Sequence, residues 1–157
     1  MSRITPEHLA AHAQWLESGG KSGRRVDESG MNLAGASLVG LQLERALFRG
    51  TTLTKADFSG SNLKGADFSG ANLDQVNFSS ADLSQANLGG VSMRHADLTA
   101  CLAIAADFSG ANMAQSNLSA ANLSQADLTA ANAAGCRFDE AILVAAKLQQ
   151  SQGIVAS

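Results

Sequence analysis

The fold is decided by residues 56–70, Ala-Asp-Phe-Ser-Gly-Ser-Asn-Leu-Lys-Gly-Ala-Asp-Phe-Ser-Gly, which hold three copies of one five-residue unit. The large apolar residue at the centre of the unit recurs every five residues from Leu33 to Leu148 without a slip, which defines 24 units over residues 31–150. The central residue is Leu in 14 units, Phe in 6, Met in 2 and Ala in 2. Such self-similarity at a fixed period indicates a repeat architecture.

The other positions of the unit are equally regular. The residue two places before the centre is small in 22 of the 24 units, and the residue between the two is Asn nine times and Asp six times. A period of five fits neither an α-helix nor a plain strand. The two inward residues of a unit, the small one and the central one, are two places apart, and the next inward residue follows three places later. This spacing predicts a short extended segment and then a corner. Gly recurs at the last place, as at Gly60 and Gly70, where a type II turn requires positive φ. The chain is therefore expected to form a coil that stacks on itself.

These units resemble those of a known family. Ala56–Gly60, Ala66–Gly70 and Ala121–Gln125 are similar to the A(D/N)LXX unit of the pentapeptide-repeat family, and the resemblance covers 120 of the 157 residues. It implies an all-β fold, a right-handed quadrilateral β-helix (solenoid) with four units per coil and about six coils. With strands about 4.8 Å apart, the rod would be about 29 Å long. All six Phe would then lie on two opposite walls of a narrow lumen, which accounts for an aromatic content of only 4%.

Three segments are expected: an N-terminal helix and capping loop over 1–30, the β-helix over 31–150, and a C-terminal tail or short cap over 151–157. The helix is predicted over 5–18, with Thr5 as the N-cap, Pro6 at the first helical position and Gly19 and Gly20 ending it. This α-helical cap is expected to cover the N-terminal edge, because exposed strand edges invite aggregation.

The unit over 26–30 is in register, but Glu28 occupies its inward position. A buried unpaired carboxylate would cost several kcal/mol. Regular coils are therefore expected from residue 31.

A departure from the pattern lies near the C-terminal end. If the register holds, Ala103 points inward while Leu102 and Ile104 point outward, and Ile142 and Val144 repeat this on the same face two coils later. One interpretation is a local rearrangement that tucks Leu102 inward. The other is an apolar patch used for self-association. The resemblance favours the second, since family members often dimerise through their C-terminal coils.

Acidic residues form ladders on two opposite walls, Asp67, Asp107 and Asp127 on one and Asp57 and Asp97 on the other. In the structural interpretation, Asp and Asn side chains bond turn backbone and one another. In the functional interpretation, they form a negative stripe that imitates the phosphates of duplex DNA. Some family members act as DNA mimics that bind type II topoisomerases and protect them from quinolones.

Two observations weigh against the mimic. Residues 31–150 contain ten acidic and seven basic residues, a balance of only −3. The unbroken period also leaves no room for the projecting loops that topoisomerase-protecting members often carry.

The residues that could carry chemistry are few. Catalysis needs converging groups in a concave site, whereas this surface is convex and dominated by Ser, Thr, Asn, Asp and Gln. His8 and His12 have the i, i+4 spacing of a metal pair, but nothing nearby completes a site, so a histidine packed in the cap is favoured. Cys101 and Cys136 occupy small inward positions and are expected to pack. We therefore predict no enzyme, no metal site and no cofactor.

Charge and hydropathy limit the partners. A formal charge of −3 speaks against direct nucleic-acid binding. No run of 18 apolar residues occurs and residues 1–6 lack the apolar core of a signal peptide, so no membrane insertion and a cytoplasmic location are expected. The sequence thus predicts a non-enzymatic structural or protein-interaction module with an unidentified protein partner. The alternative is a DNA mimic that binds gyrase and modulates quinolone sensitivity.

Overall fold

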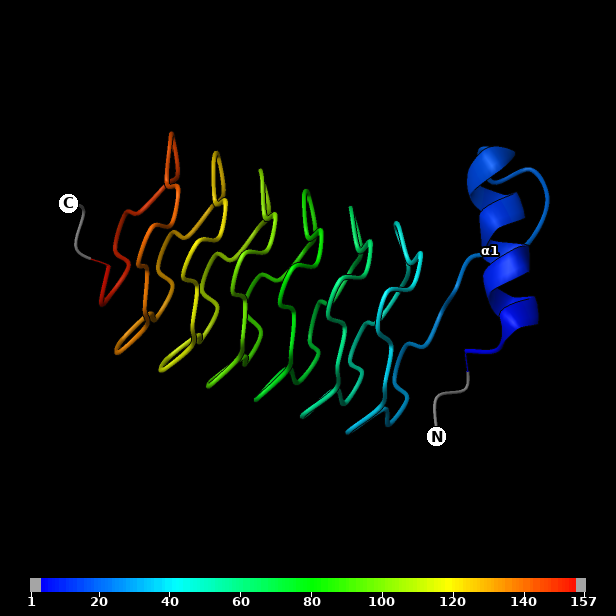
Figure 1. Ribbon diagram of the computed structural model, residues 1–157, viewed down its shortest axis with the longest axis horizontal. Helices are drawn as coiled ribbons and strands as arrows, with labels where there is room; N and C mark the ends of the chain where they lie inside the picture. Colours follow the sequence, from blue (N-terminus) through cyan, green and yellow to red (C-terminus); the bar gives the residue numbers. More distant parts are fainter. Residues whose placement is uncertain (1–3, 155–157) are drawn as a thin grey trace.

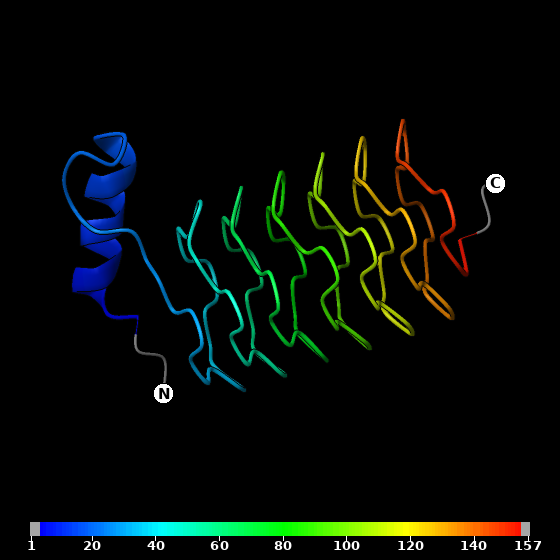
Figure 2. The same ribbon diagram turned by 180° about the vertical axis from the view of Figure 1, so that it is seen from behind.

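The chain forms a helix followed by a long stack of similar coils. In the computed structural model, which describes residues 4–154, the helix α1 (Pro6–Glu17) lies at one end of the stack and the C-terminal end of the chain lies at the other (Figure 1). The opposite view shows the same coils side by side along the long axis (Figure 2). Coils far apart in sequence are therefore far apart in space, and each coil contacts only its neighbours.

Each coil consists of four five-residue units. Single parallel bridges join the residue before each unit's centre to the residue 20 positions later, from Asp27–Leu47 to Asn132–Gln152. Asp57 illustrates the bridge to the preceding coil. Its N–H donates to Ala36 O at 2.9 Å and its carbonyl accepts from Leu38 N at 2.7 Å. The strands are one bridge long because the chain turns after every unit. The predicted β-helix is confirmed by this ladder.

Every corner uses the left-handed region of backbone space. The last residue of each unit from Gly30 to Gln150 has φ between 56° and 72°. Most corners are closed by a hydrogen bond from the first residue of the next unit, as from Ala36 N to Leu33 O at 3.0 Å. These are the predicted type II turns, with positive φ at their third residue. Only ten of the 25 corner residues are Gly, so the geometry is imposed by the stack rather than by glycine alone.

The interior is filled by columns of central residues. Phe48 stacks on Phe68 with ring centroids 5.1 Å apart, and Phe58 stacks on Phe78 with centroids 5.4 Å apart. The two columns meet edge to face, as between Phe48 and Phe58, whose planes differ by 80°. Rings from facing walls therefore touch across the lumen, which leaves no space for a larger aromatic content.

The N-terminal helix begins as the sequence predicts. His8 N donates to Thr5 Oγ1 and Thr5 N donates to His8 Nδ1, both at 3.3 Å, and Pro6 occupies the first helical position. The helix ends at Glu17, with positive φ at Gly19 and Gly20. Leu9 is partly buried and packs against the core, which places α1 against the first coil.

The regular ladder extends past the limits expected from sequence. Asp27 already bridges Leu47, and Glu28, only 8% exposed, donates its backbone N–H to Leu47 O at 2.9 Å. The backbone register thus begins before residue 31 even though a carboxylate stands at the inward position. At the other end Gln152 bridges Asn132, while 155–157 of the predicted tail lie outside the described residues.

Candidate functional site

The acidic ladders are first of all part of the turns. Asp57 Oδ1 accepts from Ser59 N at 2.9 Å, two residues further along the chain. Asp67, Asp97, Asp107 and Asp127 make the same bond at 2.8–3.0 Å. Each of these side chains is therefore held at a fixed angle on the surface, as the structural interpretation predicts.

The two ladders differ in how far their charge is neutralised. Arg49 Nε lies 2.6 Å from Asp67 Oδ2, and Lys147 Nζ lies 3.1 Å from Asp127 Oδ2. Hydrogen bonds from the Thr129 hydroxyl and backbone N–H, and then from Lys147, lower the pKa of Asp127 to about 2. Within residues 4–154, by contrast, Asp57, Asp97 and Asp107 form no salt bridge.

One acidic residue that the sequence analysis did not single out is the most strongly held. Asp74, only 9% exposed, accepts hydrogen bonds from Ser92 Oγ at 2.6 Å and from Arg94 Nη2 at 2.5 Å. The hydrogen bonds from the Arg94 side chain, opposed by burial, lower the pKa of Asp74 to about 2. The spacing of 20 residues between Asp74 and Arg94 is the signal that could have revealed this pair. The Asp74–Arg94 pair thus links one coil to the next.

The apolar patch is present as the in-register interpretation describes it. Ala103 is fully buried, while Leu102 and Ile104 are 46% and 36% exposed. Ile142, 46% exposed, lies in the same bridge column as Leu102, and Val144 is 68% exposed. The rearrangement that would tuck Leu102 inward does not occur. A further exposed apolar side chain that the sequence did not single out is Val39, which is 49% exposed and lies on the first coil.

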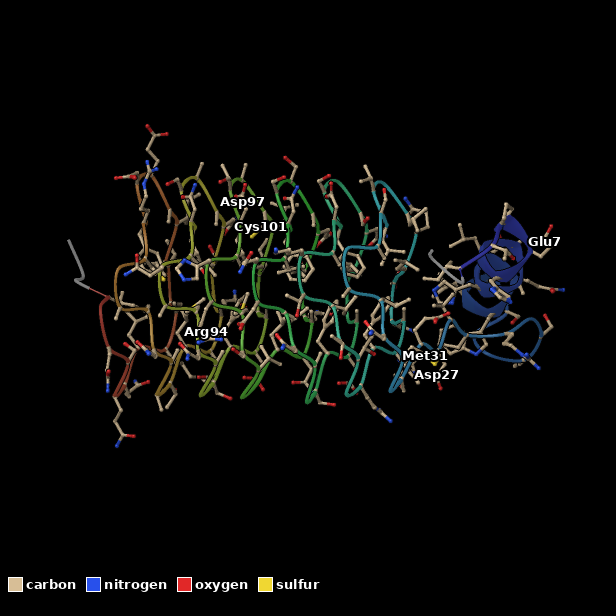
Figure 3. The ribbon with its side chains drawn as sticks, turned by 90° about the horizontal axis from the view of Figure 1, so that it is seen from below. Glu7, Asp27, Met31, Arg94, Asp97 and Cys101 are labelled. Carbon is tan, nitrogen blue, oxygen red and sulfur yellow. The ribbon has the colours of Figure 1, made fainter. Side chains whose placement is uncertain are left out.

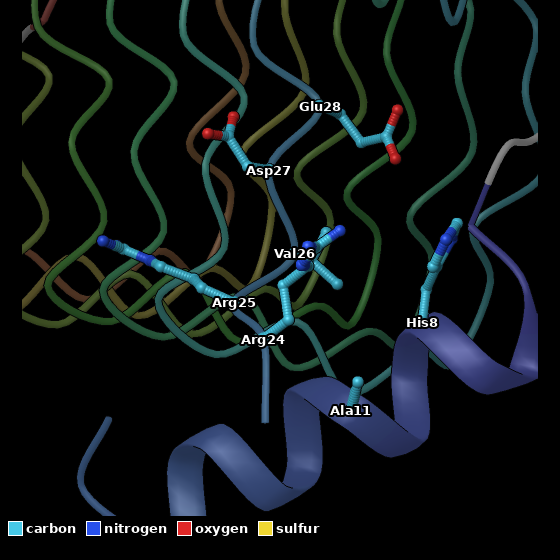
Figure 4. Close-up of a pocket in the computed structure, with 7 residues that line it drawn as sticks. All are labelled: His8, Ala11, Arg24, Arg25, Val26, Asp27 and Glu28. Atoms are coloured by element: carbon cyan, nitrogen blue, oxygen red, sulfur yellow. The ribbon is translucent and has the colours of Figure 1, made fainter. Parts of the chain in front are cut away.

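A cavity lies between α1 and the first coil, where no repeat pattern predicts one. It has a volume of about 250 Å³. Figure 4 shows helix residues on one side and the start of the first coil on the other. Its lining is of mixed charge and consists of His8, Ala11, Arg24, Arg25, Val26, Asp27 and Glu28. Two Arg and two carboxylate side chains line it, and none of the seven lining residues is a Ser, Thr, Cys or Lys that could serve as a nucleophile.

A family profile described as pentapeptide repeats matches eight copies of the unit in this chain. The matches span residues 29–65, 61–99, 106–144 and 121–152. The chain belongs to the pentapeptide-repeat family. No curated protein sequence matches it significantly.

Solved structures of other pentapeptide-repeat proteins resemble this one. The protein alr5209 of Nostoc PCC 7120 is 28% identical with a TM-score of 0.53, covering 66% of this chain and 78% of that one. HetL of Nostoc sp. strain PCC 7120, a protein involved in heterocyst differentiation regulation, is 29% identical with a TM-score of 0.33 and coverages of 85% and 76%. QnrB1, a plasmid-mediated fluoroquinolone resistance protein, is 23% identical with a TM-score of 0.49 and coverages of 82% and 74%. The likeness to alr5209 supports a shared fold.

The thiols of this pentapeptide-repeat protein are structural. Cys101 is fully buried, and burial raises the pKa of its thiol to about 12. It lies close to Asp97 (Figure 3). Cys136 Sγ donates to Met113 O at 2.8 Å. Because the thiolate is the reactive form, neither cysteine is suited to act as a nucleophile.

The histidine pair of the pentapeptide-repeat protein is divided between two structural roles. His8 belongs to the capping box at Thr5, whereas His12 is fully buried between α1 and the first coil. Within residues 4–154, no group of three or more His, Cys, Asp or Glu side chains is placed to hold a metal ion. The same part of the chain contains no helix with the length and apolar character that a membrane crossing requires.

Proposed function

We propose that this pentapeptide-repeat protein is a non-enzymatic structural or protein-interaction module. One observation carries the proposal: the Asp and Asn side chains that directly precede the unit centres are fixed by bonds to their own turns, as between Asp57 Oδ1 and Ser59 N. A surface whose side chains are already ordered loses little conformational entropy when a partner binds. The two free cysteines fit a reducing cytoplasm, which we propose as the location.

The test is chemical cross-linking of the full chain in extract of its native cell, followed by mass spectrometry. Cross-links from Lys55, Lys64 and Lys147, on the outward surface, to one protein partner support the proposal. A reproducible hydrolytic or transferase activity that a single substitution abolishes contradicts it.

The proposed organisation follows the segments expected from the sequence. The expected order of a capping segment over 1–30, a right-handed quadrilateral β-helix of about six coils over 31–150 and a tail over 151–157 is kept, with the ladder of bridges reaching from Asp27 to Gln152. The contact of Leu9 with the core supports the assignment of α1 as the cap of the N-terminal edge. Without a cap, that edge would present unpaired strands.

We also propose that two copies associate through the patch of Leu102, Ile104, Ile142 and Val144. All four side chains are at least 36% exposed and lie on one face of the C-terminal coils. Burying them against a second copy removes apolar surface from water.

A matched pair of variants tests the dimer by sedimentation velocity. Ile142→Asn introduces the residue found at position 122 of the same column and should raise the dissociation constant about tenfold or more. Val39→Ser introduces the residue found one coil later at position 59 and should leave the dimer unchanged. A monomer at 100-micromolar concentrations, or equal behaviour of both variants, contradicts the proposal.

A second candidate function is a DNA mimic that binds gyrase. The observation in its favour is that Asp57, Asp97 and Asp107 form no salt bridge within residues 4–154 and are fixed in two columns. The pairing of Asp67 with Arg49 and of Asp127 with Lys147 counts against it.

A supercoiling assay with purified gyrase decides this candidate. The mimic should alter supercoiling at micromolar concentration, and the triple variant Asp57→Asn, Asp97→Asn, Asp107→Asn should not. The variant keeps its fold, because Asn77 and Asn87 make the same turn bonds in the same columns. No effect of the parent chain would end this candidate.

A further inference from the structure

His12 joins three parts of the N-terminal end. Its imidazole is fully buried, and it stacks on Trp15 of the same helix with ring centroids 5.8 Å apart. Nε2 lies 2.9 Å from the carbonyl oxygen of Glu44 in the first coil. Nδ1 lies 3.1 Å from the backbone nitrogen of Val26, where the chain enters that coil. One side chain of α1 therefore bonds both the turn at Glu44 and the segment at Val26 that leads into the ladder.

The two partners fix the protonation of the ring. A carbonyl oxygen only accepts, so Nε2 carries a hydrogen and donates to Glu44 O. A backbone N–H only donates, so Nδ1 carries no hydrogen and accepts from Val26. The arrangement is thus complete only for the neutral imidazole. A second proton, on Nδ1, would face the Val26 N–H and remove one of the two bonds.

The charged groups around the ring do not compensate for that loss. Burial is the main influence and lowers the pKa of His12, while the carbonyl of Glu44 raises it. The Arg25 guanidinium lowers the pKa further and the Glu44 carboxylate opposes this. Arg25 itself is held over Trp15, with Cζ 5.2 Å from the ring centroid, and its Nε donates to Arg45 O. Protonation is therefore easier when the ring leaves its site.

We propose that His12 is a pH-sensitive latch, which holds α1 against the first coil while the imidazole is neutral and releases α1 when it is protonated. The latch goes beyond the proposed function, because it concerns the state of the capping helix and requires no partner. The sign follows from linkage: a group whose pKa is lowered in the docked state stabilises docking fully above its ordinary pKa of 6.5 and loses this as the pH falls.

The test uses the single Trp of the chain, which lies in α1 next to the latch. The full-length protein is labelled with 5-fluorotryptophan, and ¹⁹F NMR measures the ratio of released to docked α1 between pH 7 and pH 5. One proton taken up on release predicts that this ratio rises as the pH falls below about 6.5, by at most about tenfold per pH unit. A ratio that stays constant over this range would overturn the proposal.

Two variants separate the latch from a general effect of acid. His12→Gln retains a hydrogen-bonding side chain that does not titrate, so its ratio should not change with pH. His95→Gln is the matched control, because Gln75 and Gln115 occupy the same corner one coil before and after it. This control should behave as the parent chain does. A pH dependence that persists in His12→Gln would overturn the latch.

If His12→Gln leaves α1 released at every pH, a titration of His12 in the parent chain still tests the latch. The ring of His12 is then titrated by NMR of its Cε1–H. The latch requires an apparent pKa for His12 that lies below its ordinary value of 6.5 and coincides with the midpoint of α1 release. An apparent pKa of His12 at or above 6.5 would overturn it.

Discussion

Phe48 and Phe68, twenty residues apart in sequence, lie with their rings 9° from parallel and their centroids 5.1 Å apart. Phe68 also meets Phe58 and Phe78 edge to face, at 5.9 and 5.6 Å. Each ring thus contacts the coil above or below and the facing wall, so the aromatic cluster ties together the coils in the N-terminal half of the solenoid.

Replacing Phe68 with Ala should therefore lower the free energy of unfolding by about 3–5 kcal/mol, because it removes these contacts and leaves a cavity. Phe68→Leu should cost only about 1 kcal/mol, since Leu fills the same place in the column at positions 88 and 128. Urea unfolding followed by circular dichroism measures both. Ser109→Ala is the control, because within residues 4–154 the Ser109 hydroxyl has no hydrogen-bond partner. A parent-like midpoint for Phe68→Ala would show that the aromatic cluster is not a main source of stability.

The corner residues predict a gain in stability from glycine. Ala105 has φ of 56°, which costs an L-residue about 1–2 kcal/mol, although glycine loses about 0.5–1 kcal/mol of chain entropy on folding. Ala105→Gly should thus stabilise the chain by about 0.5–1 kcal/mol in a thermal melt. The reverse change Gly60→Ala should destabilise the chain by a similar amount. The added Cβ meets nothing within 4 Å, so the cost is that of the positive φ alone. Ala106→Gly, one residue beyond the corner, should be destabilising, and a stabilising effect there would contradict this account.

The small inward position should not accept a larger side chain. Ala46, Ala66, Ala86, Ala106 and Ala126 form one column of fully buried methyl groups. Ala106→Leu should therefore cost about 1–3 kcal/mol in urea unfolding, because the extra carbons must displace packed neighbours. Ala134→Leu, at an exposed outward position, is the control and should change the midpoint little. Equal midpoints for the two variants would be inconsistent with the inward assignment of Ala106.

The pair of Asp74 and Arg94 predicts a pH dependence. The pKa of Asp74 is about 2 in the folded chain, below its ordinary value of 3.8. The ionised carboxylate thus stabilises the fold above about pH 4, and this stabilisation is lost as the pH falls toward 2.

Arg94→Met should raise the pKa of Asp74 toward 3.8 and move acid unfolding to higher pH. Carboxyl ¹³C NMR and circular dichroism measure the two effects. Arg137→Met is the matched control, because the Arg137–Asp139 pair is more than 60% exposed on both sides and contributes little. An unchanged pKa of Asp74 in Arg94→Met would contradict the assigned cause.

The repeat made most of the fold predictable from sequence. A strict period from Leu33 to Leu148 specifies both which residues point inward and where the corners fall. At Ala103 and Leu102 the sequence left two interpretations open, and the structure shows that the register holds there. The part of the fold that was missed lacks the repeat. The cavity beside α1 depends on how a helix and the unit at 26–30 meet, and no periodicity encodes that contact.

The contacts and backbone conformations of individual residues were also harder to predict from the sequence. Asp74 and Arg94 stand one place after a unit centre, where residue types vary, so nothing marks them as partners until the 20-residue register is applied. The left-handed corners at Ala105 and His95 were likewise hidden, because non-glycine residues rarely adopt positive φ unless neighbouring turns impose it.

The 20-residue ladder has a mechanical consequence. The two ends of the chain lie at opposite ends of the stack, and every bridge joins neighbouring coils only. Force applied between the ends therefore loads the coils in series, and the terminal coil gives way first because it is held on one side. Each coil that peels away frees 20 residues and lengthens the chain by about 60 Å. Under tension the solenoid therefore lengthens in equal steps, one coil at a time.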